Sequence, residues 1–566
     1  MKRKAADVPW YIADFETTGE NEYNTTGRTR VWLYAISDKN GDIISYGDNI
    51  EKFMEWCYNN HGSLIYFHNL RFDGVFIISY LLEHGFGHEE RLLSHSKRGF
   101  STLIGDMGEF YQIKINFASN RQVTIYDSLK LIPMSVREIA RAFNLPVTKG
   151  EIDYDNYTIN DVTLDYVFRD VKIVAMAMRY FRDNGYYRMT IGSNAYHSYY
   201  DNSPFAKTAF PRLDREWIKL WREAYRGGRT QVNPRYANTI LNNVRRYDLN
   251  SMYPSIMAQK PLPYGPPIVC DKPGRFKFEL YYVHIMFKLK EGHLPTLLKS
   301  SSIYNKAGDS YYIDSEGIID LRISNLDLMI MKRHYDIYIL KYIEILGFKC
   351  ALNLFREWVN EHYKLKSEST GGMRLFYKLT LNSLYGKFGS RPTGKNKTPY
   401  LDEDGVIHLK LGEEHDMGVY YLPIAIAIVS WAHVMIDDAI MMTGYDNFVY
   451  CDTDSVHTLG DLDPSVVDQK ELGKFKLEGI EDISKYIRQK TYIFKENGTW
   501  QITCAGMSYG IREYLIDKYG DDIINIFTIG LHVDKDSEGI NPRQLKLLPK
   551  KVPGGVILVP SPFSLL

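Results

Sequence analysis

The sequence predicts a multidomain α/β protein, and three observations predict that class. At 566 residues the chain exceeds what a single hydrophobic core fills, and about four domains are expected for that length. The hydrophobic fraction of 45% is enough for several cores. Short apolar, strand-like runs end in polar residues in both halves of the chain, and segments with helical spacing lie between them.

A strand-like run at 447–450 leads into two aspartates, Asp452 and Asp454, within the sequence Y-C-D-T-D-S of residues 450–455. If this segment is the tip of a β-hairpin, residues spaced by two point to the same face, and both carboxylates project together. Such close like charges resist joint ionisation unless cations neutralise them, which favours a site for Mg²⁺ and substrate phosphates. Taken alone, the same residues also suit an ordinary polar turn.

A third carboxylate precedes this pair by about 200 residues. Residues 246–254 read R-Y-D-L-N-S-M-Y-P, so that Asp248 follows an apolar and basic run. Pro254 limits any strand at that point because proline cannot donate to a ladder.

Between the two aspartate segments, residues 364–397 contain eight Lys or Arg and one acid. Four side chains fall on one face of a helix by their spacing: Arg374, Lys378, Asn382 and Tyr385. A basic face with an aromatic tip suits a triphosphate and a stacked base. A solvated charged face is the alternative interpretation.

These three segments, in this order, resemble the D-x-x-S-x-Y-P, K-x-x-x-N-S-x-Y-G and Y-x-D-T-D-S motifs of the family B DNA polymerases. The resemblance implies that Asp248 and Asp454 bind two catalytic metal ions, with Asp452 in support and the backbone carbonyl of Leu249 as a further ligand. It implies nucleotide contacts at these positions: Ser251, Tyr253, Lys366, Arg374, Lys378, Asn382 and Tyr385. Tyr253 would lie under the sugar and exclude a 2′-hydroxyl, and Tyr385 would pack on the nascent base pair. Lys490 and Tyr492 resemble the family's K-x-Y, which contacts the primer end.

The N-terminal part carries a second group of carboxylates. Asp14 and Glu16 lie on one face of an apolar strand-like run, and Asp73 follows a second such run. Tyr166 and Asp170 are one helical turn apart. Each segment alone is more often solvated than catalytic.

Together these segments resemble a 3′→5′ exonuclease whose four carboxylates hold two metal ions. The resemblance implies that Tyr166 orients the attacking water and that Lys149 assists catalysis. It also implies contacts with an unpaired 3′ end at these residues: His68, Asn69, Phe72, Ser128 and Leu129. For His68 a satisfied buried histidine, and for Lys149 a simple loop cation, remain open alternatives.

The family's organisation implies an RNase H-like exonuclease followed by a right-hand polymerase with palm, fingers and thumb. The sequence Y-R-G-G at Tyr225, Arg226, Gly227 and Gly228 resembles a loop that joins the two modules and binds template; its glycines allow close backbone approach. The expected boundaries are 1–188 for the exonuclease, 189–259 and 422–525 for the palm, 351–389 for the fingers and 526–566 for the thumb.

Two further segments, 260–350 and 390–421, are longer than the connections they replace would need. They resemble the two terminal-protein regions of the protein-primed subgroup of these polymerases, which includes phage enzymes that replicate linear genomes. That resemblance implies priming by a hydroxyl of a terminal protein, processive synthesis and strand displacement. Arg374 stands where the subgroup has Lys, and His433 where it has Arg.

The expected cofactor is Mg²⁺, two ions in each active site, with Mn²⁺ able to substitute. The expected partners are template and primer DNA, deoxynucleoside triphosphates, a terminal protein and a single-stranded DNA-binding protein. The net charge of zero does not oppose DNA binding, because local rather than total charge sets phosphate affinity.

The five scattered cysteines offer no zinc spacing and suit a reducing compartment. No apolar signal segment follows the basic start, and the apolar stretch 422–436 is shorter than a membrane span. We therefore expect no membrane span, a buried helix at 422–436, and residence in the cytoplasm of an infected host cell.

Three other interpretations remain open. A protein-primed polymerase of a linear plasmid or mobile element would use the same chemistry in another setting. A stand-alone 3′→5′ exonuclease would leave Asp248, Lys378 and Asp454 without a purpose. An inactive replication scaffold would have no need of intact carboxylates or of metal binding.

Overall fold

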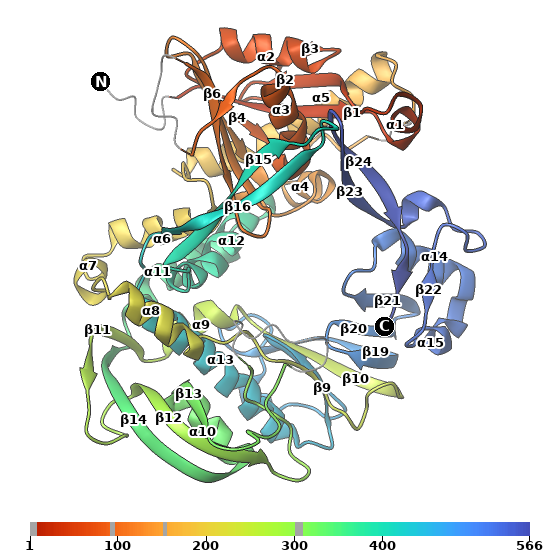
Figure 1. Cartoon of the computed structure of the whole chain (residues 1–566). Coiled ribbons are helices and arrows are strands. Elements are labelled where there is room, and N and C mark those ends of the chain that lie inside the picture. Colours follow the sequence, from red (N-terminus) through yellow and green to blue (C-terminus); the bar gives the residue numbers. More distant parts are fainter. Residues whose placement is uncertain (1–7, 91–96, 151–154, 300–309) are drawn as a thin grey trace.

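The computed structural model describes residues 8–90, 97–150, 155–299 and 310–566. Figure 1 shows the N-terminal sheet at one end of the molecule and the segment around β12 and β14 at the other. The C-terminal strands run along one side and return to the N-terminal sheet, where the backbone N–H of Thr29 donates to the carbonyl of Pro553 at 3.0 Å.

The N-terminal part is an eight-stranded mixed sheet in the order β3-β2-β1-β4-β8-β7-β6-β5. The long helix α5 covers one face with Val167 and Val171, whereas α2 and α3 cover the other with Phe53 and Phe76. Its strands are β1 (Trp10–Thr17), β2 (Val31–Ser37), β3 (Ile43–Gly47), β4 (Leu64–Phe67), β5 (Gly87–His88), β6 (Arg98–Ile104), β7 (Phe110–Phe117) and β8 (Gln122–Asp127). Its helices are α1 (Glu20–Thr26), α2 (Ile50–Asn59), α3 (Leu70–Glu83), α4 (Val136–Ala142) and α5 (Asp161–Asp183), with the 3-10 turn η2 (Ser128–Lys130).

The second sheet has seven strands in the order β21-β20-β19-β10-β18-β17-β9. Strand β10 lies between β19 and β18, both antiparallel to it, so that its end meets the tip of the β17–β18 hairpin. The strands are β9 (Thr230–Val232), β10 (Ile240–Leu249), β17 (Phe448–Asp452), β18 (Ser455–Thr458), β19 (Phe475–Arg488), β20 (Thr491–Glu496) and β21 (Thr499–Cys504). The 3-10 turn η4 (Pro464–Val466) lies between β18 and β19.

Helix α13 (Leu422–Thr443) packs behind this sheet, which confirms the expected buried helix but corrects its length. The helix has 22 residues and ends at Gly444, whose φ of 78° stops it. Among the described residues it alone is long and apolar enough to cross a membrane. We expected the apolar stretch to be too short for a span, and the length of the helix corrects that expectation. Of its apolar window, 78% lies inside the protein, as in a core helix.

The described residues of the 260–350 segment form a four-stranded antiparallel sheet in the order β11-β14-β12-β13, with α10 packed on it. The strands are β11 (Leu262–Val269), β12 (Phe278–Leu289), β13 (Ile319–Ser324) and the 17-residue β14 (Tyr335–Ala351), and the helix is α10 (Asn325–His334). The side chains of Leu328 and Met331 on α10 join the core under this sheet.

Two antiparallel helices, α11 (Arg356–Glu368) and α12 (Gly371–Phe388), follow and lead into a hairpin of β15 (Thr393–Leu401) and β16 (Ile407–Asp416). Figure 1 shows this hairpin extending from α12 towards the N-terminal sheet. Helix α6 (Ile191–Asn202) packs on α12, and α9 (Met252–Gln259) packs on α12 and α13. Helix α7 (Ala206–Ala209) contacts α6 and β11, and α8 (Arg215–Trp221) contacts the 3-10 turn η3 (Arg222–Ala224).

The C-terminal part stacks α14 (Tyr509–Tyr519), η5 (Gly520–Asp522), α15 (Ile523–Ile526) and η6 (Pro542–Gln544) on the end of the seven-stranded sheet. Its strands are β22 (His532–Val533), β23 (Lys546–Val552), β24 (Gly555–Ser561) and β25 (Phe563–Ser564). The hairpin β23–β24 touches α1 and α3 of the N-terminal part. The cation of Lys550 lies 5.5 Å from the centre of the Tyr23 ring, and Arg543 pairs with Asp155 at 2.8 Å.

Candidate active sites

The predicted hairpin tip exists: β17 and β18 pair antiparallel and turn at Thr453 and Asp454. Asp248 at the end of β10 lies opposite Ser455, and the backbone N–H of Leu249 donates to the carbonyl of Asp454 at 2.8 Å. Burial, and then the charge of Asp454, raise the pKa of Asp248 to about 7, and burial raises the pKa of Asp454. These two carboxylates form the unneutralised pair at which a cation would be stabilised.

Asp452 has a different environment from Asp454. Its carboxylate accepts hydrogen bonds from Nζ of Lys490 at 2.8 and 3.0 Å and from Oγ1 of Thr230 at 2.9 Å. The Tyr450 hydroxyl donates to it at 3.3 Å. Asp452 is therefore already paired, which agrees with a supporting place beside the Asp248–Asp454 pair.

Helices α11 and α12 carry three cationic side chains near these carboxylates: Lys366, Arg374 and Lys378. Nζ of Lys366 donates to Oγ of Ser251 at 2.9 Å, and the guanidinium of Arg374 donates to the carbonyl of Lys366 at 3.2 Å. Burial, followed by the charges of Arg374 and Lys378, lowers the pKa of Lys366 to about 8. Such crowding of like charges is relieved by an anion, and phosphate oxygens are suitable acceptors.

The remaining predicted nucleotide residues lie around the same space. The rings of Tyr253 and Tyr385 stack with their centres 4.0 Å apart, and Asn382 is exposed on the same helix as Lys378. Tyr492 packs among the aromatic rings behind the hairpin, 5.2 Å from Tyr450. Lys490 is held against Asp452, so that it reaches the hairpin tip from β19's end.

The second predicted site is a pocket of about 290 Å³ on the N-terminal sheet. It gathers the four predicted carboxylates from β1, α3 and α5: Asp14, Glu16, Asp73 and Asp170. His68, Asn69, Phe72, Lys149 and Tyr166 also line it. Segments separated by up to about 150 residues thus meet in one cavity.

Burial and mutual repulsion disfavour the ionised form of the carboxylates in this pocket. Burial, and then the charge of Asp170, raise the pKa of Asp14 to about 7, and burial raises the pKa of Glu16 and Asp73 well above their usual values. Lys149 forms an ion pair with Asp170, and its ammonium lies 4.9 Å from the centre of the Tyr166 ring. The other Asp170 oxygen, Oδ1, is buried without a hydrogen-bond partner.

Two of the predicted single-strand contacts, His68 and Ser128, form hydrogen bonds within the protein. The ring nitrogens of His68 lie 2.9 Å from Oγ of Ser128 and 2.7 Å from the carbonyl of Met134, so this histidine is satisfied within the protein. Ser128 is fully buried and donates to the carbonyl of Phe67 at 3.0 Å. Neither Ser128 nor Leu129 lines the pocket, whereas Asn69 and Phe72 do.

The Y-R-G-G loop is also only partly open to a ligand. The guanidinium of Arg226 is 3% exposed and donates to the carbonyls of Leu298 and Arg322 in the 260–350 segment. Gly228 packs on the hairpin, since a Cβ there would lie 2.8 Å from Oγ1 of Thr453. Tyr225 and Gly227 complete the loop, and the carbonyl of Gly227 lies 2.7 Å from Nε2 of His433.

Both sites suit divalent cations in the chemistry of their donors, although neither holds a complete set of protein ligands. Within the described ranges, no three His, Cys, Asp or Glu side chains are arranged ready to hold an ion. Mg²⁺ commonly takes one or two carboxylates and completes its shell with water and substrate phosphates. The raised pKa values at both sites and the unpartnered Oδ1 of Asp170 fit such ions.

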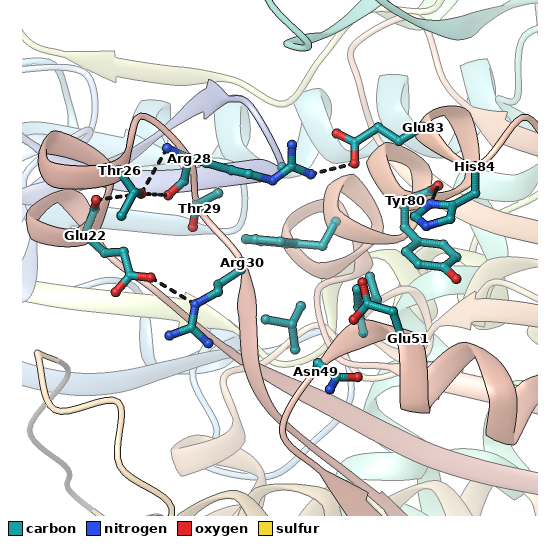
Figure 2. A pocket seen from close by; sticks show the side chains of 14 residues that line it. Glu22, Thr26, Arg28, Thr29, Arg30, Asn49, Glu51, Tyr80, Glu83 and His84 are labelled. Atoms are coloured by element: carbon teal, nitrogen blue, oxygen red, sulfur yellow. Dashed lines mark hydrogen bonds and ion pairs between the residues drawn. The ribbon is translucent and has the colours of Figure 1, made fainter.

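A further hollow of about 460 Å³ lies between α1, α2 and α3, away from these carboxylates (Figure 2). Its arginines are already paired, Arg28 with Glu83 at 2.5 Å and Arg30 with Glu22 at 2.9 Å. Gly554 at the tip of β23–β24 also lines it. The hollow marks where the C-terminal hairpin meets the N-terminal part.

Sequence reasoning missed several residues of both sites. Glu478 on β19 raises the pKa of Asp248 and Asp454, and Thr230 bonds Asp452. Leu558 on β24 lines the N-terminal pocket from the far end of the chain. Thr230 follows the Y-R-G-G loop closely and could have been found from that signal, but an apolar residue such as Leu558 carries none.

A family described as "DNA polymerase type B, organellar and viral" matches residues 54–158 and 155–471. The match spans more than half of the chain and includes Asp248, Lys378, Asp452 and Asp454. The chain belongs to this family and is a DNA polymerase, a nucleotidyltransferase.

Within the family the chain is homologous to the DNA polymerase of Bacillus phage phi29, with 36% identity over 98% of both chains. The DNA polymerase of Streptococcus phage Cp-1 is 32% identical over 89% of this chain and 92% of its own. The solved phi29 polymerase in complex with primer-template DNA and incoming nucleotide is 34% identical, with a TM-score of 0.87 over 99% of this chain and all of that one. These comparisons confirm the resemblance on which the sequence prediction was based.

Proposed function

We propose that this polymerase replicates a linear DNA genome by protein-primed, processive, strand-displacing synthesis with 3′→5′ proofreading. The observation that carries the proposal is the placement of the Asp248–Asp454 pair near the three cations Lys366, Arg374 and Lys378. The Asp248–Asp454 pair would be stabilised by cations, and the three basic side chains beside it would be stabilised by an anion. A nucleoside triphosphate with divalent metal satisfies both.

In this proposal the polymerase site transfers a nucleotidyl group to a primer 3′-hydroxyl and releases pyrophosphate. Asp248, Asp454 and the carbonyl of Leu249 would hold two Mg²⁺ ions, which supply activation of the attacking oxygen and stabilisation of the leaving oxygen; Mn²⁺ would substitute. Lys366, Arg374 and Lys378 bind the triphosphate, and the tyrosine stack of Tyr253 and Tyr385 sits against the sugar and base.

The N-terminal pocket excises mispaired 3′ ends. Asp14, Glu16, Asp73 and Asp170 would hold the ions there. Lys149 positions Asp170 through its ion pair, and Tyr166 lies beside that lysine to orient water. Asn69 and Phe72 line the pocket and are available to contact an unpaired DNA strand. His68 and Ser128 bond to each other and would act on the DNA only through the residues that they position.

The proposed domain boundaries are those that the family's organisation implies. The exonuclease comprises 1–188, the palm 189–259 and 422–525, the fingers 351–389, and the thumb 526–566. The segments 260–350 and 390–421 are the terminal-protein regions, and a terminal protein supplies the priming hydroxyl. Similarity to a phi29 polymerase solved with primer-template DNA and nucleotide supports the DNA and nucleotide partners.

The setting proposed is the cytoplasm of an infected host cell, where a single-stranded DNA-binding protein covers the displaced strand. Five free cysteines are compatible with a reducing compartment. A linear plasmid or mobile element remains the second candidate setting, and the polymerases of phages phi29 and Cp-1 favour the first.

The deciding experiment extends a primer on a single-stranded DNA circle with four deoxynucleotides and Mg²⁺, and sizes the products on an alkaline gel. Products many times the circle's length are expected. Products of one circle or less would refute strand displacement, and primer degradation without extension would leave only the nuclease. Omission of Mg²⁺ serves as the control for the metal.

Terminal-protein priming needs its own assay, because the circle carries a DNA primer. The purified terminal protein of the same genetic element is incubated with this polymerase, an origin fragment and a labelled deoxynucleotide. A covalent protein–nucleotide adduct that survives denaturing electrophoresis is expected. Its absence, with primer extension intact, would refute protein priming alone.

A further inference from the structure

The turn that carries the polymerase aspartates is strained. Thr453 has φ of 59°, in the left-handed region that a β-branched side chain rarely adopts. Such a conformation persists only where the surrounding structure over-determines it. The contacts that hold Thr453 therefore also determine where Asp452 and Asp454 point.

Those contacts come from the loop that precedes β9. The backbone N–H of Thr453 donates to the carbonyl of Arg229 at 2.8 Å, and Gly228 packs against the Thr453 side chain. The next residue, Thr230, donates to Asp452 at 2.9 Å and pairs with it in the ladder. Residues 228–230 thus contact Asp452 and Thr453, the residues through which the chain enters the strained turn.

The loop has little regular structure of its own, since residues 225–229 are neither helix nor strand and β9 has only three residues. β9 is also the edge strand of its sheet, with β17 as its neighbour. Something outside the ladder must fix the position of this backbone.

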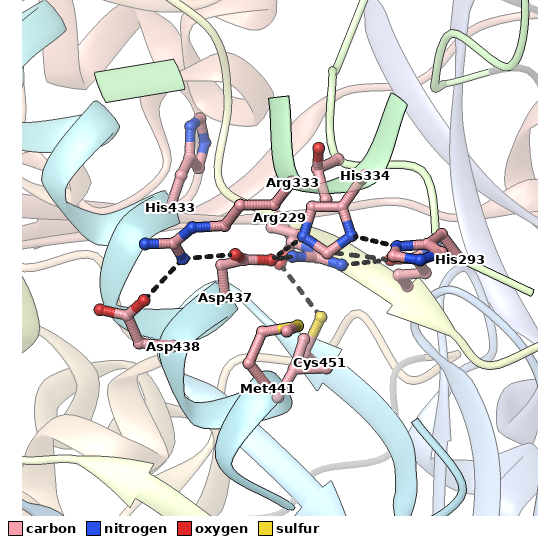
Figure 3. A network of polar contacts seen from close by, with 12 residues as sticks. Arg229, His293, Arg333, His334, His433, Asp437, Asp438, Met441 and Cys451 are labelled. Carbon is pink, nitrogen blue, oxygen red and sulfur yellow. Dashed lines mark hydrogen bonds and ion pairs between the residues drawn. The ribbon is translucent and has the colours of Figure 1, made fainter. Parts of the chain in front are cut away.

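A buried charge network supplies that anchor (Figure 3). The guanidinium of Arg229, 2% exposed, donates to Oδ1 of Asp437 at 3.0 Å and to Oε1 of Gln231 at 3.1 Å. Asp437 on α13 is 0% exposed and also accepts from Arg333 at 3.0 Å, while Nε2 of His334 lies 2.9 Å from it. Asp438 pairs with Arg333 at 2.7 Å, so two acids balance two arginines.

The 260–350 segment holds the same loop at a second point. The hydroxyl of Tyr311 accepts from the backbone N–H of Thr230 at 3.0 Å and donates to its carbonyl at 3.1 Å. Arg333 and His334 of the charge network lie on α10 of this segment. The segment expected to receive a terminal protein is therefore joined by hydrogen bonds to the backbone beside the catalytic turn.

We propose that Arg229, anchored by Asp437, is a positioning residue of the polymerase site, and that together with Tyr311 it fixes the Thr453 turn and so the placement of Asp452 and Asp454. The anchor joins α13 and the 260–350 segment to that turn. This inference rests on the proposed polymerase site, and it concerns residues that touch neither metal nor substrate.

A purely structural ion pair is the competing explanation, but it accounts for less. Buried ion pairs contribute little net stability, because desolvation offsets their attraction, and apolar replacements are often neutral. If the Arg229–Asp437 pair only stabilised the fold, the carbonyl of Arg229 would not also need to accept a hydrogen bond from Thr453 in the strained turn. The test must therefore measure catalytic geometry separately from folding.

The first variant is Asp437→Asn, which keeps the side-chain volume but removes the charge that anchors Arg229. Asp446→Asn is the matched control, because Asp446 pairs with the neighbouring Arg235 on the exposed surface. Single-turnover insertion at varied deoxynucleotide concentration separates the maximal rate from nucleotide affinity. Excision of single-stranded DNA by the same preparation reports on the N-terminal site.

For Asp437→Asn the maximal insertion rate is expected to fall about tenfold, since small displacements of reacting groups are costly, with nucleotide affinity and excision within about twofold of wild type. The control is expected to match wild type. An insertion rate like that of wild type would overturn the proposal. A parallel fall in rate, affinity and excision would overturn it too, because it would indicate loss of structure only.

If Asp437→Asn does not fold, Tyr311→Phe decides alone. It removes one hydroxyl that holds Thr230 and leaves the ring packed. A fall of about threefold in the maximal insertion rate, with unchanged nucleotide affinity, is expected; an unchanged rate overturns the proposal. The parent assay keeps the two ideas separate, because failure of wild type to extend a primer, or survival of extension in Asp454→Asn, would refute the proposed site itself.

Discussion

At the scale of single residues, the two carboxylate sites are separable by mutation. Asp14→Ala is expected to lower excision at least about a hundredfold while leaving extension intact, because Asp14 lies in the N-terminal pocket, whose lining contains no residue of β17. Asp454→Ala is expected to do the reverse. Both rates are measured on the same labelled primer-template. Loss of both activities in either folded variant would contradict two independent sites.

Lys366 provides a prediction about pH. Its pKa is lowered to about 8 by burial and by Arg374 and Lys378, so the free enzyme loses this charge as the pH rises from 7 to 9. Because the proposed role of Lys366 is to bind the triphosphate in its protonated form, the KM for nucleotide is expected to rise about fivefold across that range.

Lys366→Arg is the control for this pH effect, because arginine stays charged throughout the range. Its KM should change little between pH 7 and 9. Equal rises in wild type and variant would show that another group titrates. Steady-state incorporation of one nucleotide at a series of pH values provides the measurement.

Residue chemistry was predictable from sequence where it depends on local spacing. The alternation up to Asp452 and Asp454 indicated a hairpin tip, and the recurrence of Arg374, Lys378 and Asn382 indicated one helix face; both elements exist. The bond from Lys366 to Ser251 was not predictable, because 115 residues separate the partners. No local pattern pointed to Arg229, because its partner Asp437 lies 208 residues away.

At the scale of elements, the tip of the β23–β24 hairpin determines whether the C-terminal part touches the N-terminal part. Gly554 has φ of 85°, and a Cβ there would lie 2.2 Å from the carbonyl of Thr29. Gly554→Ala should therefore displace the tip from α1 and α3. If this contact helps to retain DNA, product length per binding event is expected to fall about threefold to tenfold, with the single-nucleotide insertion rate unchanged.

Gly539→Ala is the matched control for backbone strain. Gly539 lies in the same C-terminal part with φ of 82°, but its Cβ would meet only Tyr514 at 3.9 Å. Both changes cost about 1–2 kcal/mol in backbone conformation. Extension in the presence of a DNA trap measures processivity, and equal shortening in both variants would assign the effect to strain rather than to the contact.

Element boundaries show where sequence patterns fail. The apolar stretch 422–436 predicted a buried helix correctly, but α13 continues through Met441 and Met442 to Thr443. These residues are compatible with a helix and carry no stop signal, and the chain turns only at Gly444. Side-chain pattern therefore identified the element, whereas the glycine fixed its end.

At the scale of the whole molecule, the β15–β16 hairpin can be removed without stretching the chain. The backbone N–H of Met417 donates to the carbonyl of Pro392 at 2.9 Å, so a short glycine link can replace residues 393–416. We expect primer extension on an open single strand to persist and synthesis beyond one circle length to fall at least about tenfold, because the proposed function assigns this insert to strand separation. Charge removal at the hairpin tip, Glu403→Gln, is the control.

Product lengths on a primed circle and on an open single-stranded template give the comparison. Retention of long products by the shortened chain would refute a role for this insert in displacement. Loss of extension on both templates would place the insert in the polymerase site itself.

The contacts of Pro553 with Thr29 and of Arg543 with Asp155 join the last module of the chain to the first. These contacts close a ring of modules, and if the DNA of the proposed function passes through that ring, a DNA circle offers no end to thread. Association with a circle would require those contacts to open first, whereas a linear primer-template could enter by its end. Binding to circles is then expected to be slower than binding to linear DNA. A complex in which the enzyme already encircles a DNA circle should persist through a sudden rise in salt that dissociates an enzyme bound near a DNA end.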